Sequence, residues 1–138
     1  MPSSKELKDV GLKTTLPRLR ILAILEEGKG HHFTAEDVYK ALLDAGEEIA
    51  FATVYRVLTQ FENAGLVLRH NFEGGRSVFE LDSGQHHDHM VCAKCNTVTE
   101  FYDVEIEERQ RIVAKKHNFK LEDHSLYLYG ICSNCQKS

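Results

Sequence analysis

The 138-residue sequence lacks any apolar run near the roughly 20 residues that a membrane-spanning helix requires. Its N-terminus lacks the apolar stretch of a secretory signal, which predicts a cytoplasmic protein without a membrane partner. Positive charge is also scarce, since 17 Lys and Arg stand against 21 Asp and Glu and the formal net charge is −4. This balance argues against a broad electrostatic grip on nucleic acid but not against a local one. We find no internal repeat and no low-complexity tract.

Acidic residues are missing from two stretches of the N-terminal half. Residues 10–25 contain three basic residues and no acid, and residues 49–61 contain Arg56 as their only charged residue. Neither half of the chain is basic as a whole, because residues 1–80 and residues 81–138 each carry a formal charge of −2. The two acid-free stretches are therefore where we expect a contact with a polyanion.

The N-terminal half is predicted to begin with three helices. Apolar periodicity, a proline near one start and glycines near the ends predict helices over residues 15–28, 34–46 and 52–64. Thr34 is expected to cap the second helix, with Asp37 as its capping-box partner. The third helix has the clearest apolar stripe and is analysed below.

A hairpin is predicted to follow the three helices. Residues 66–72 and 77–82 read as strands on either side of a Glu-Gly-Gly turn signal at 73–75. Three helices followed by a hairpin form the order of a winged helix-turn-helix module, a design used mostly for DNA binding. We therefore expect a DNA-binding domain over residues 1–82.

The C-terminal half is predicted to form a separate small domain. A short polar break at residues 83–85 is the expected hinge, and the second domain spans residues 86–138. Its predicted elements are strands over 86–92 and 97–103, a helix over 104–117 and a final strand over 119–131. The expected fold class is α+β, a winged-helix domain followed by a small α/β domain. Because so small a unit is at the edge of independent stability, we expect a metal staple or dimerisation.

The third predicted helix carries an acid-free polar face opposite its core stripe. On a helical wheel the stripe consists of Val54, Val57, Leu58 and Phe61. The opposite arc consists of Ala52, Thr53, Tyr55, Arg56, Thr59, Gln60 and Asn63. Arg suits guanine, while Thr, Gln and Tyr reach base edges, thymine methyl groups or phosphates. We interpret this face as a reading surface for the major groove, with an ordinary solvated face as the alternative.

Basic residues outside this helix are further candidates for DNA contacts. Lys13 and Arg18 are expected at the DNA backbone or in the minor groove, and Arg69 and Arg76 lie on the predicted wing. Taken singly, each is better explained as a solubilising surface charge.

Two cysteine pairs, Cys92-x-x-Cys95 and Cys132-x-x-Cys135, each stand at the end of a predicted strand. A thiolate pair at this spacing supplies adjacent tetrahedral positions, and two pairs complete a closed zinc site. The alternatives are a redox-active pair, which needs a low-pKa thiol at the start of a helix, and buried free thiols. We predict a structural Zn²⁺ that fixes the last strand to the first strand of this domain.

The segment His86-His87-Asp88-His89 places four metal-ligand candidates in succession. Side chains alternate across a strand, so His86 and Asp88 share one face while His87 and His89 share the other. We predict two metal sites, with a polar exposed turn as the alternative. The candidates for the remaining ligands, which the residues alone do not pair with a face, are His32, Glu80, Glu100, Glu107 and His124. The other histidines, which we expect at the surface or at helix caps, are His31, His70 and His117.

Three motifs together resemble the ferric uptake regulator family of bacterial metal-dependent repressors. They are the Ala-Thr-Val-Tyr-Arg-Val-Leu segment at 52–58, the histidine-rich segment at 86–92 and the double Cys-x-x-Cys motif. The resemblance runs from Leu12 to Cys135. It implies a homodimer, open to further association, with N-terminal winged-helix domains and C-terminal dimerisation domains.

The resemblance also implies ligand sets and DNA contacts. The residues that look like the family's regulatory metal site are His32, Glu80, His87, His89 and Glu100. The residues that look like its second metal site are His86, Asp88, Glu107 and His124. Lys13 resembles the family's minor-groove contact, and Tyr55 and Arg56 resemble its major-groove readers. The four cysteines match its structural zinc site.

The implied function is repression of iron-uptake genes by a dimer that binds palindromic, A/T-rich operators when metallated. Fe²⁺ is the implied corepressor, with Mn²⁺ or Zn²⁺ as substitutes, and a zinc- or peroxide-sensing regulator is the alternative. Glu100 stands where the peroxide-sensing branch would carry Asp, which favours iron. A zinc hydrolase is disfavoured because the chain has no HExxH helix and because an enzyme gives no reason for the acid-free helix face. A zinc-stapled adaptor for proteins is a third option.

Overall fold

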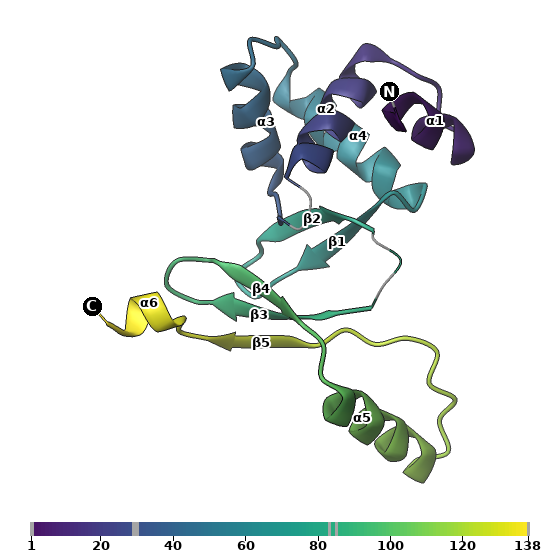
Figure 1. Ribbon diagram of the computed structural model, residues 1–138, viewed down its shortest axis with the longest axis vertical. Coiled ribbons are helices and arrows are strands. Elements are labelled where there is room, and N and C mark those ends of the chain that lie inside the picture. The colour runs from purple at the N-terminus through teal and green to yellow at the C-terminus, as the bar shows by residue number, and fades with distance from the viewer. Residues whose placement is uncertain (1, 29–30, 83, 85, 138) are drawn as a thin grey trace. The chain divides into compact units, whose positions relative to one another are not determined.

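The chain forms two compact units, Met1–Gly84 and Gln85–Ser138, in a computed structural model that describes residues 2–28, 31–82, 84 and 86–137 (Figure 1). The predicted hinge falls mainly on Ser83 and Gln85, which lie outside the described residues. Both units combine helices with a small sheet, so the α+β fold class is confirmed. No helix within the described ranges is long and apolar enough to cross a bilayer.

The N-terminal unit contains the three predicted helices and the predicted hairpin, preceded by one helix that the pattern did not indicate. Its elements are α1 (Pro2–Asp9), α2 (Leu16–Glu27), α3 (Ala35–Asp44), α4 (Phe51–Asn63), β1 (Val67–Asn71) and β2 (Ser77–Leu81). The unexpected α1 is short and polar, and its Leu7 is fully buried. One buried residue among the described side chains of α1 produces no apolar periodicity, which is why α1 escaped prediction.

Local signals fix where α2 and α3 begin. The Thr15 hydroxyl accepts a hydrogen bond from the Arg18 N–H at 3.4 Å, and Pro17 lies in the first turn of α2. The Thr34 hydroxyl accepts from the Asp37 N–H at 3.0 Å, while the Asp37 carboxylate accepts from the Thr34 N–H at 3.0 Å. The predicted capping box of α3 is thus confirmed, and it satisfies amides that no helical carbonyl can reach.

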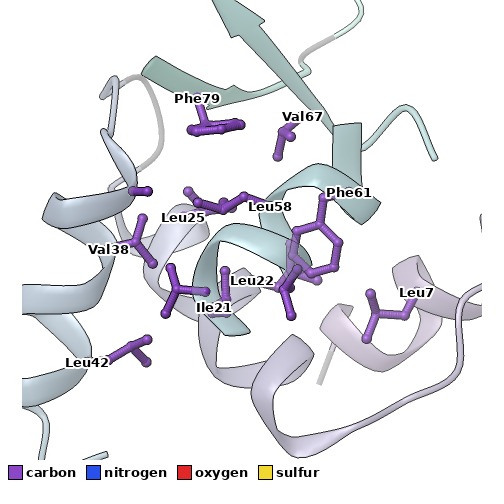
Figure 2. Close-up of a cluster of buried hydrophobic side chains, with 13 residues drawn as sticks. Leu7, Ile21, Leu22, Leu25, Val38, Leu42, Leu58, Phe61, Val67 and Phe79 are labelled. Atoms are coloured by element: carbon purple, nitrogen blue, oxygen red, sulfur yellow. The ribbon is translucent and has the colours of Figure 1, made fainter. Parts of the chain in front are cut away.

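The helices and the hairpin of this unit enclose one hydrophobic core (Figure 2). The predicted stripe of α4 is confirmed, since its buried residues are Val54, Val57, Leu58 and Phe61. Val67 and Phe79 bring the hairpin into the same core. A backbone bridge between Phe33 and Phe79, with N–H···O distances of 2.9 and 2.7 Å, joins the segment before α3 to β2. That bridge brings His32 beside Glu80, the residues that flank it.

The C-terminal unit is built on a three-stranded sheet in the order β4-β3-β5. Its elements are β3 (Asp88–Cys92), β4 (Val98–Phe101), α5 (Val104–Lys116), β5 (Tyr127–Gly130) and α6 (Ser133–Gln136). β3 pairs antiparallel with β4 and parallel with β5. The first two predicted strands and the predicted helix are confirmed in slightly shorter form, and α6 was not predicted.

The final predicted strand, over residues 119–131, is wrong in its extent. Only Tyr127–Gly130 forms a strand, and residues 119–126 reach it as an irregular segment. In the parallel register Tyr127 lies opposite His89, near the start of β3, so residues 119–125 have no paired strand within the described chain. The apolar alternation of this segment therefore does not reflect strand pairing.

Candidate metal centres and DNA interface

The four cysteines of the C-terminal unit converge on one point. One pair begins at Cys92, the last residue of β3, and the other follows β5, and the parallel pairing of these strands brings their ends together. All four sulfur atoms lie within 4.8 Å of one another, and the Cys95 and Cys132 sulfurs are 3.7 Å apart. Tetrahedral Zn–S bonds of about 2.3 Å place sulfurs about 3.8 Å apart, so the cluster fits a structural Zn²⁺.

Hydrogen bonds around the cluster favour thiolate at two of its sulfurs. Cys92 Sγ accepts from the N–H groups of Cys132 and Cys95, each at 3.4 Å, and these bonds lower the pKa of Cys92 to about 6. Hydrogen bonds from Thr97 lower the pKa of Cys95. Hydrogen bonding to the Cys132 and Cys95 side chains raises the pKa of Cys135 to about 12. Four thiolates this close therefore need a cation to remain ionised together.

A second cluster in the same unit joins the start of β3 to α5 and to the segment before β5. Its members are His86, Asp88, Glu107 and His124, whose ligand atoms all lie within 4.8 Å of one another. Glu107 is central, because its Oε1 is 3.1 Å from His86 Nε2 and its Oε2 is 3.1 Å from His124 Nε2. His86 Nε2 also lies 3.1 Å from Asp88 Oδ1. The structure thus brings together the four residues predicted as the second site.

The second cluster contains two buried carboxylates whose negative charge a bound cation would neutralise. Asp88 and Glu107 are 1% and 5% exposed, and Asp88 Oδ2 has no hydrogen-bond partner among the residues that the structure describes. A buried carboxylate oxygen without a partner is costly. Two imidazoles with two carboxylates also form the mixed donor set that suits Fe²⁺, Mn²⁺ or Zn²⁺. These residues therefore fit a divalent metal ion.

In the N-terminal unit, the buried Glu80 of β2 lies between two histidines. Its Oε2 is 2.9 Å from His32 Nε2, and its Oε1 is 2.7 Å from His70 Nε2. The expectation that His70 is a surface or capping residue is wrong, because it is 8% exposed and bonded to Glu80. Burial along β1 does not alternate strictly, so period-two patterning could not reveal this pair.

The other two histidines of that expectation behave as predicted. His31 is exposed, and His117 caps the C-terminus of α5, where its N–H donates to the Val113 carbonyl at 3.3 Å.

In the C-terminal unit, three further predicted ligands lie together at the β3–β4 pair. His89 is opposite Glu100 in the antiparallel register and is 2% exposed. His87 Nε2 is 3.3 Å from Glu100 Oε1, and the rings of His87 and His89 are 4.9 Å apart. Each unit thus presents a formed part of the predicted regulatory set, with His32 and Glu80 in one unit and these three in the other. That both parts bind one ion stays a prediction.

All five predicted DNA contacts lie in the N-terminal unit. On α4, Tyr55 and Arg56 are exposed, and Thr59 is half-buried. The Arg56 guanidinium donates to the Thr53 hydroxyl at 3.3 Å, within the same face. Lys13 is exposed in the segment between α1 and α2. The polar face of α4 is therefore open to solvent where a DNA contact was predicted.

Arg18 of α2, the fifth predicted contact, ties the Lys13 segment to α4. Its NH1 donates to the Lys13 carbonyl at 2.8 Å. Its Nε and NH2 donate to Gln60 Oε1 at 3.3 and 3.1 Å. The side chain therefore connects the two acid-free stretches and keeps only part of its five donors for another partner.

Arg69 of β1 contacts the same face of α4 from the hairpin. Its NH1 donates to Tyr55 Oη at 3.1 Å, and its NH2 donates to Thr59 Oγ1 at 3.0 Å. Its Nε lies 3.2 Å from Glu62 Oε1. The guanidinium carbon is 5.4 Å from the ring centroid of Tyr55 and 4.8 Å from that of Phe79. Periodicity placed Arg69 on the wing and could not show partners that lie in another element.

Comparisons with known proteins agree with these motifs and their placement. A profile of the Ferric uptake regulator family matches residues 9–129. The Ferric uptake regulation protein of Legionella pneumophila is 62% identical over 136 residues, which cover 99% of this chain and 100% of the relative. The chain belongs to the ferric uptake regulator family. Since this family consists of metal-dependent transcriptional repressors, the chain is one of them.

Solved structures of ferric uptake regulators confirm the fold class. The crystal structure of the Vibrio cholerae regulator, which reveals a rearrangement of its DNA-binding domains, matches with a TM-score of 0.87 at 58% identity. The match covers 94% of this chain and 98% of that chain. The regulator from Francisella tularensis, solved with iron, matches with a TM-score of 0.88 at 40% identity, covering 91% and 96%.

Proposed function

We propose that this ferric uptake regulator represses iron-uptake genes as a homodimer that binds palindromic, A/T-rich operators when Fe²⁺ is bound. The main support for the proposal is that the predicted regulatory ligands are divided between the two units. The N-terminal unit supplies two of them and the C-terminal unit three, which are His32 and Glu80, and His87, His89 and Glu100. An ion bound by both parts would supply bonds that restrict the relative orientation of the units. In a symmetric dimer this orientation sets the spacing and angle of the two α4 helices, and hence their fit to a palindrome.

Two observations favour Fe²⁺ among the metals that this donor set accepts. Imidazoles with carboxylates accept Fe²⁺, Mn²⁺ and Zn²⁺, and since intrinsic affinity favours zinc, availability and geometry decide in the cell. The Francisella tularensis regulator was solved with iron. Glu100 also departs from the Asp that we expect in the peroxide-sensing branch. Mn²⁺ and Zn²⁺ should replace Fe²⁺ in vitro.

The DNA contacts are proposed at the acid-free stretches. Tyr55, Arg56 and Thr59 would enter the major groove on α4, with the Arg56 guanidinium suited to the O6 and N7 acceptors of guanine. Lys13 would reach the minor groove, and the remaining donors of Arg18 would contact a phosphate. This arrangement explains how a chain with a net charge of −4 can bind a polyanion locally.

The C-terminal unit is proposed to form the dimer. Its exposed large apolar residues are Met90, Tyr102, Val104, Ile112, Val113, Phe119, Leu121, Leu128, Tyr129 and Ile131. Val113, Phe119 and Leu121 help to line an open groove of about 450 Å³. A unit of this size that leaves so many apolar side chains exposed buries too little surface to be stable alone. A second copy of the chain would cover them.

Operator affinity, measured anaerobically against free Fe²⁺, Mn²⁺ and Zn²⁺ with the cysteine zinc retained, tests the proposal. We expect saturating metal to tighten operator binding about 100-fold. Glu80→Gln should lose most of that gain, whereas Arg56→Ala should lose operator binding and keep metal binding. Equal operator affinity for the metal-loaded and metal-free dimer would refute the proposal.

A further inference from the structure

The hydrogen bonds of Arg69 determine how the Tyr55 hydroxyl can act. A guanidinium only donates, so the Tyr55 oxygen is the acceptor of the 3.1 Å bond and its own proton must point elsewhere. No described residue accepts that proton, and Tyr55 is 45% exposed. Tyr55 therefore presents an O–H donor at the surface of α4.

The Thr59 hydroxyl is occupied in both of its roles. It donates to the Tyr55 carbonyl at 3.0 Å, one helical turn earlier. It accepts from Arg69 NH2 at 3.0 Å. Because its proton is already used, Thr59 cannot donate to DNA, and its methyl group is the part that suits a thymine methyl.

Gln60, like Tyr55, presents a hydrogen-bond donor at the surface of α4. Arg18 donates to it from two nitrogens, at 3.3 and 3.1 Å, so the oxygen of the amide must face Arg18. The NH2 group of Gln60 then points away from Arg18. Tyr55, Gln60 and the Arg56 guanidinium thus each present a donor on this face.

We propose that Arg69 is a positioning residue that sets the hydrogen-bond polarity of the reading face. By donating to the oxygens of Tyr55 and Thr59, it turns the Tyr55 O–H outward as a donor beside Arg56 and Gln60, and donors select acceptor edges of DNA. Guanine, through O6 and N7, and thymine, through O4, present acceptors and no donor in the major groove. Adenine pairs its N7 acceptor with an amino donor, and cytosine presents an amino donor alone, so both match the face less well. Arg69 acts through these two residues, since its own side chain is 17% exposed. The inference rests on the proposed function, because it assumes that α4 enters the major groove.

Selection from a randomised duplex pool by the Mn²⁺-loaded, zinc-containing dimer tests this inference. Arg69→Met keeps the apolar stem and removes every donor, and Lys40→Met removes one exposed positive charge from α3 as the matched control. We expect the wild type to select guanine or thymine where α4 reads. Arg69→Met should lower the ratio of selected to random duplex affinity about 10-fold, the scale of one base contact. Lys40→Met should keep the wild-type preference.

Salt dependence separates positioning from a direct phosphate contact. If Arg69 itself bound a phosphate, Arg69→Met would weaken binding to all duplexes and reduce the salt slope by about 1. We expect the slope to stay at its wild-type value. A reduced slope with unchanged base preference would overturn the inference.

A double-mutant cycle with Tyr55→Phe tests whether Arg69 acts through Tyr55. The double variant should lose no more base selectivity than the more affected single variant, because both remove the same oriented hydroxyl. Additive losses would overturn the inference. If Arg69→Met does not fold, as judged by thermal unfolding, Arg69→Lys should still lose selectivity, since an ammonium cannot bridge both hydroxyls as the guanidinium fork does.

Different results would contradict the proposed function and the role of Arg69. A wild type that selects no sequence, or an Arg56→Ala variant that keeps full selection, contradicts the proposed function. The role of Arg69 alone is contradicted if the wild type and Arg56→Ala behave as proposed but Arg69→Met keeps the wild-type base preference.

Discussion

The two units of this repressor are stabilised in different ways. The hydrophobic core lies in the N-terminal unit, where four helices and the hairpin contribute to it. In the described part of the C-terminal unit, the buried hydrophobic residues are Val91 and Cys92, and the buried polar residues are Asp88, His89 and Glu107. The interior of the second unit is thus occupied largely by metal-ligand candidates. We infer that apolar burial folds the first unit, whereas metal binding and dimerisation are needed by the second.

Removal of the zinc site should have the largest effect. Cys132→Ser leaves three thiolates and should unfold the C-terminal unit and dissociate the dimer, because structural zinc contributes on the order of 10 kcal/mol to small metal-dependent folds. Circular dichroism, zinc content and size-exclusion chromatography measure the three consequences. The N-terminal unit should still unfold cooperatively near its original temperature. A zinc-free variant that remained a dimer with two folded units would remove the contrast between the units.

Truncation of the core should affect the first unit alone. Phe61 is fully buried in α4, so Phe61→Ala should cost about 3–5 kcal/mol in the free energy of unfolding of the N-terminal unit. Urea denaturation measures this loss, while zinc content and dimerisation should not change. Leu43, 50% exposed in α3, provides the control, because Leu43→Ala should stay within about 0.5 kcal/mol. Equal losses from both changes would contradict the assigned core.

Replacement of the Glu107 carboxylate should distinguish the stability that bound Mn²⁺ gives the second unit from the stability that the unit has without Mn²⁺. With Mn²⁺ at 100 times its Kd for the second cluster, binding there should contribute about 2.7 kcal/mol of the wild type's gain over the zinc-only dimer, and Glu107→Gln should lose that contribution while it keeps the gain from the regulatory set. Without Mn²⁺, the same change should not destabilise the dimer, because it removes one of two adjacent buried carboxylates. Thermal unfolding with and without Mn²⁺ tests both statements.

The adjacent Glu108 is the matched control for that experiment. Its side chain is 59% exposed and pairs with Arg111 on the same helix, so Glu108→Gln should keep the full Mn²⁺-dependent gain. A loss of the gain in both variants would point to a general charge effect and not to a metal site at Glu107.

The smallest effect is expected at a helix cap of the first unit. Thr34→Ala removes the hydroxyl that accepts from the Asp37 N–H and should cost about 1 kcal/mol in urea denaturation. Thr34→Ser should recover most of this loss, because it restores the acceptor. A cost shared by the C-terminal unit would show that the two units do not unfold separately.

The features that sequence predicts well here are those with local causes. The capping box at Thr34, the buried stripe ending at Phe61 and the two cysteine pairs each follow from spacing within a few residues. The features that escaped have little local signature. Among the side chains of α1 that the structure describes, Leu7 is the one that anchors the helix in the core, and the length of β5 depends on where β3 begins.

The candidate sites divide in the same way. The set of His86, Asp88, Glu107 and His124 includes a pair that strand alternation places on one face, although the family resemblance was needed to complete it. The partners of Arg69 and His70 lie in other elements, at positions that only the folded hairpin and α4 define. Cross-element hydrogen bonds leave no periodic trace in a sequence, so residues that orient others were missed while ligand types were found.

The most direct test of the account is the affinity of Mn²⁺ for the zinc-loaded dimer, measured by calorimetry with and without operator DNA. Because the coupling free energy between two binding sites is reciprocal, operator DNA should tighten Mn²⁺ binding by the same factor by which Mn²⁺ tightens operator binding, about 100-fold. Glu80→Gln should remove the factor in both directions. An Mn²⁺ affinity that operator DNA leaves unchanged would contradict the claim that the regulatory metal and the DNA-reading unit are coupled.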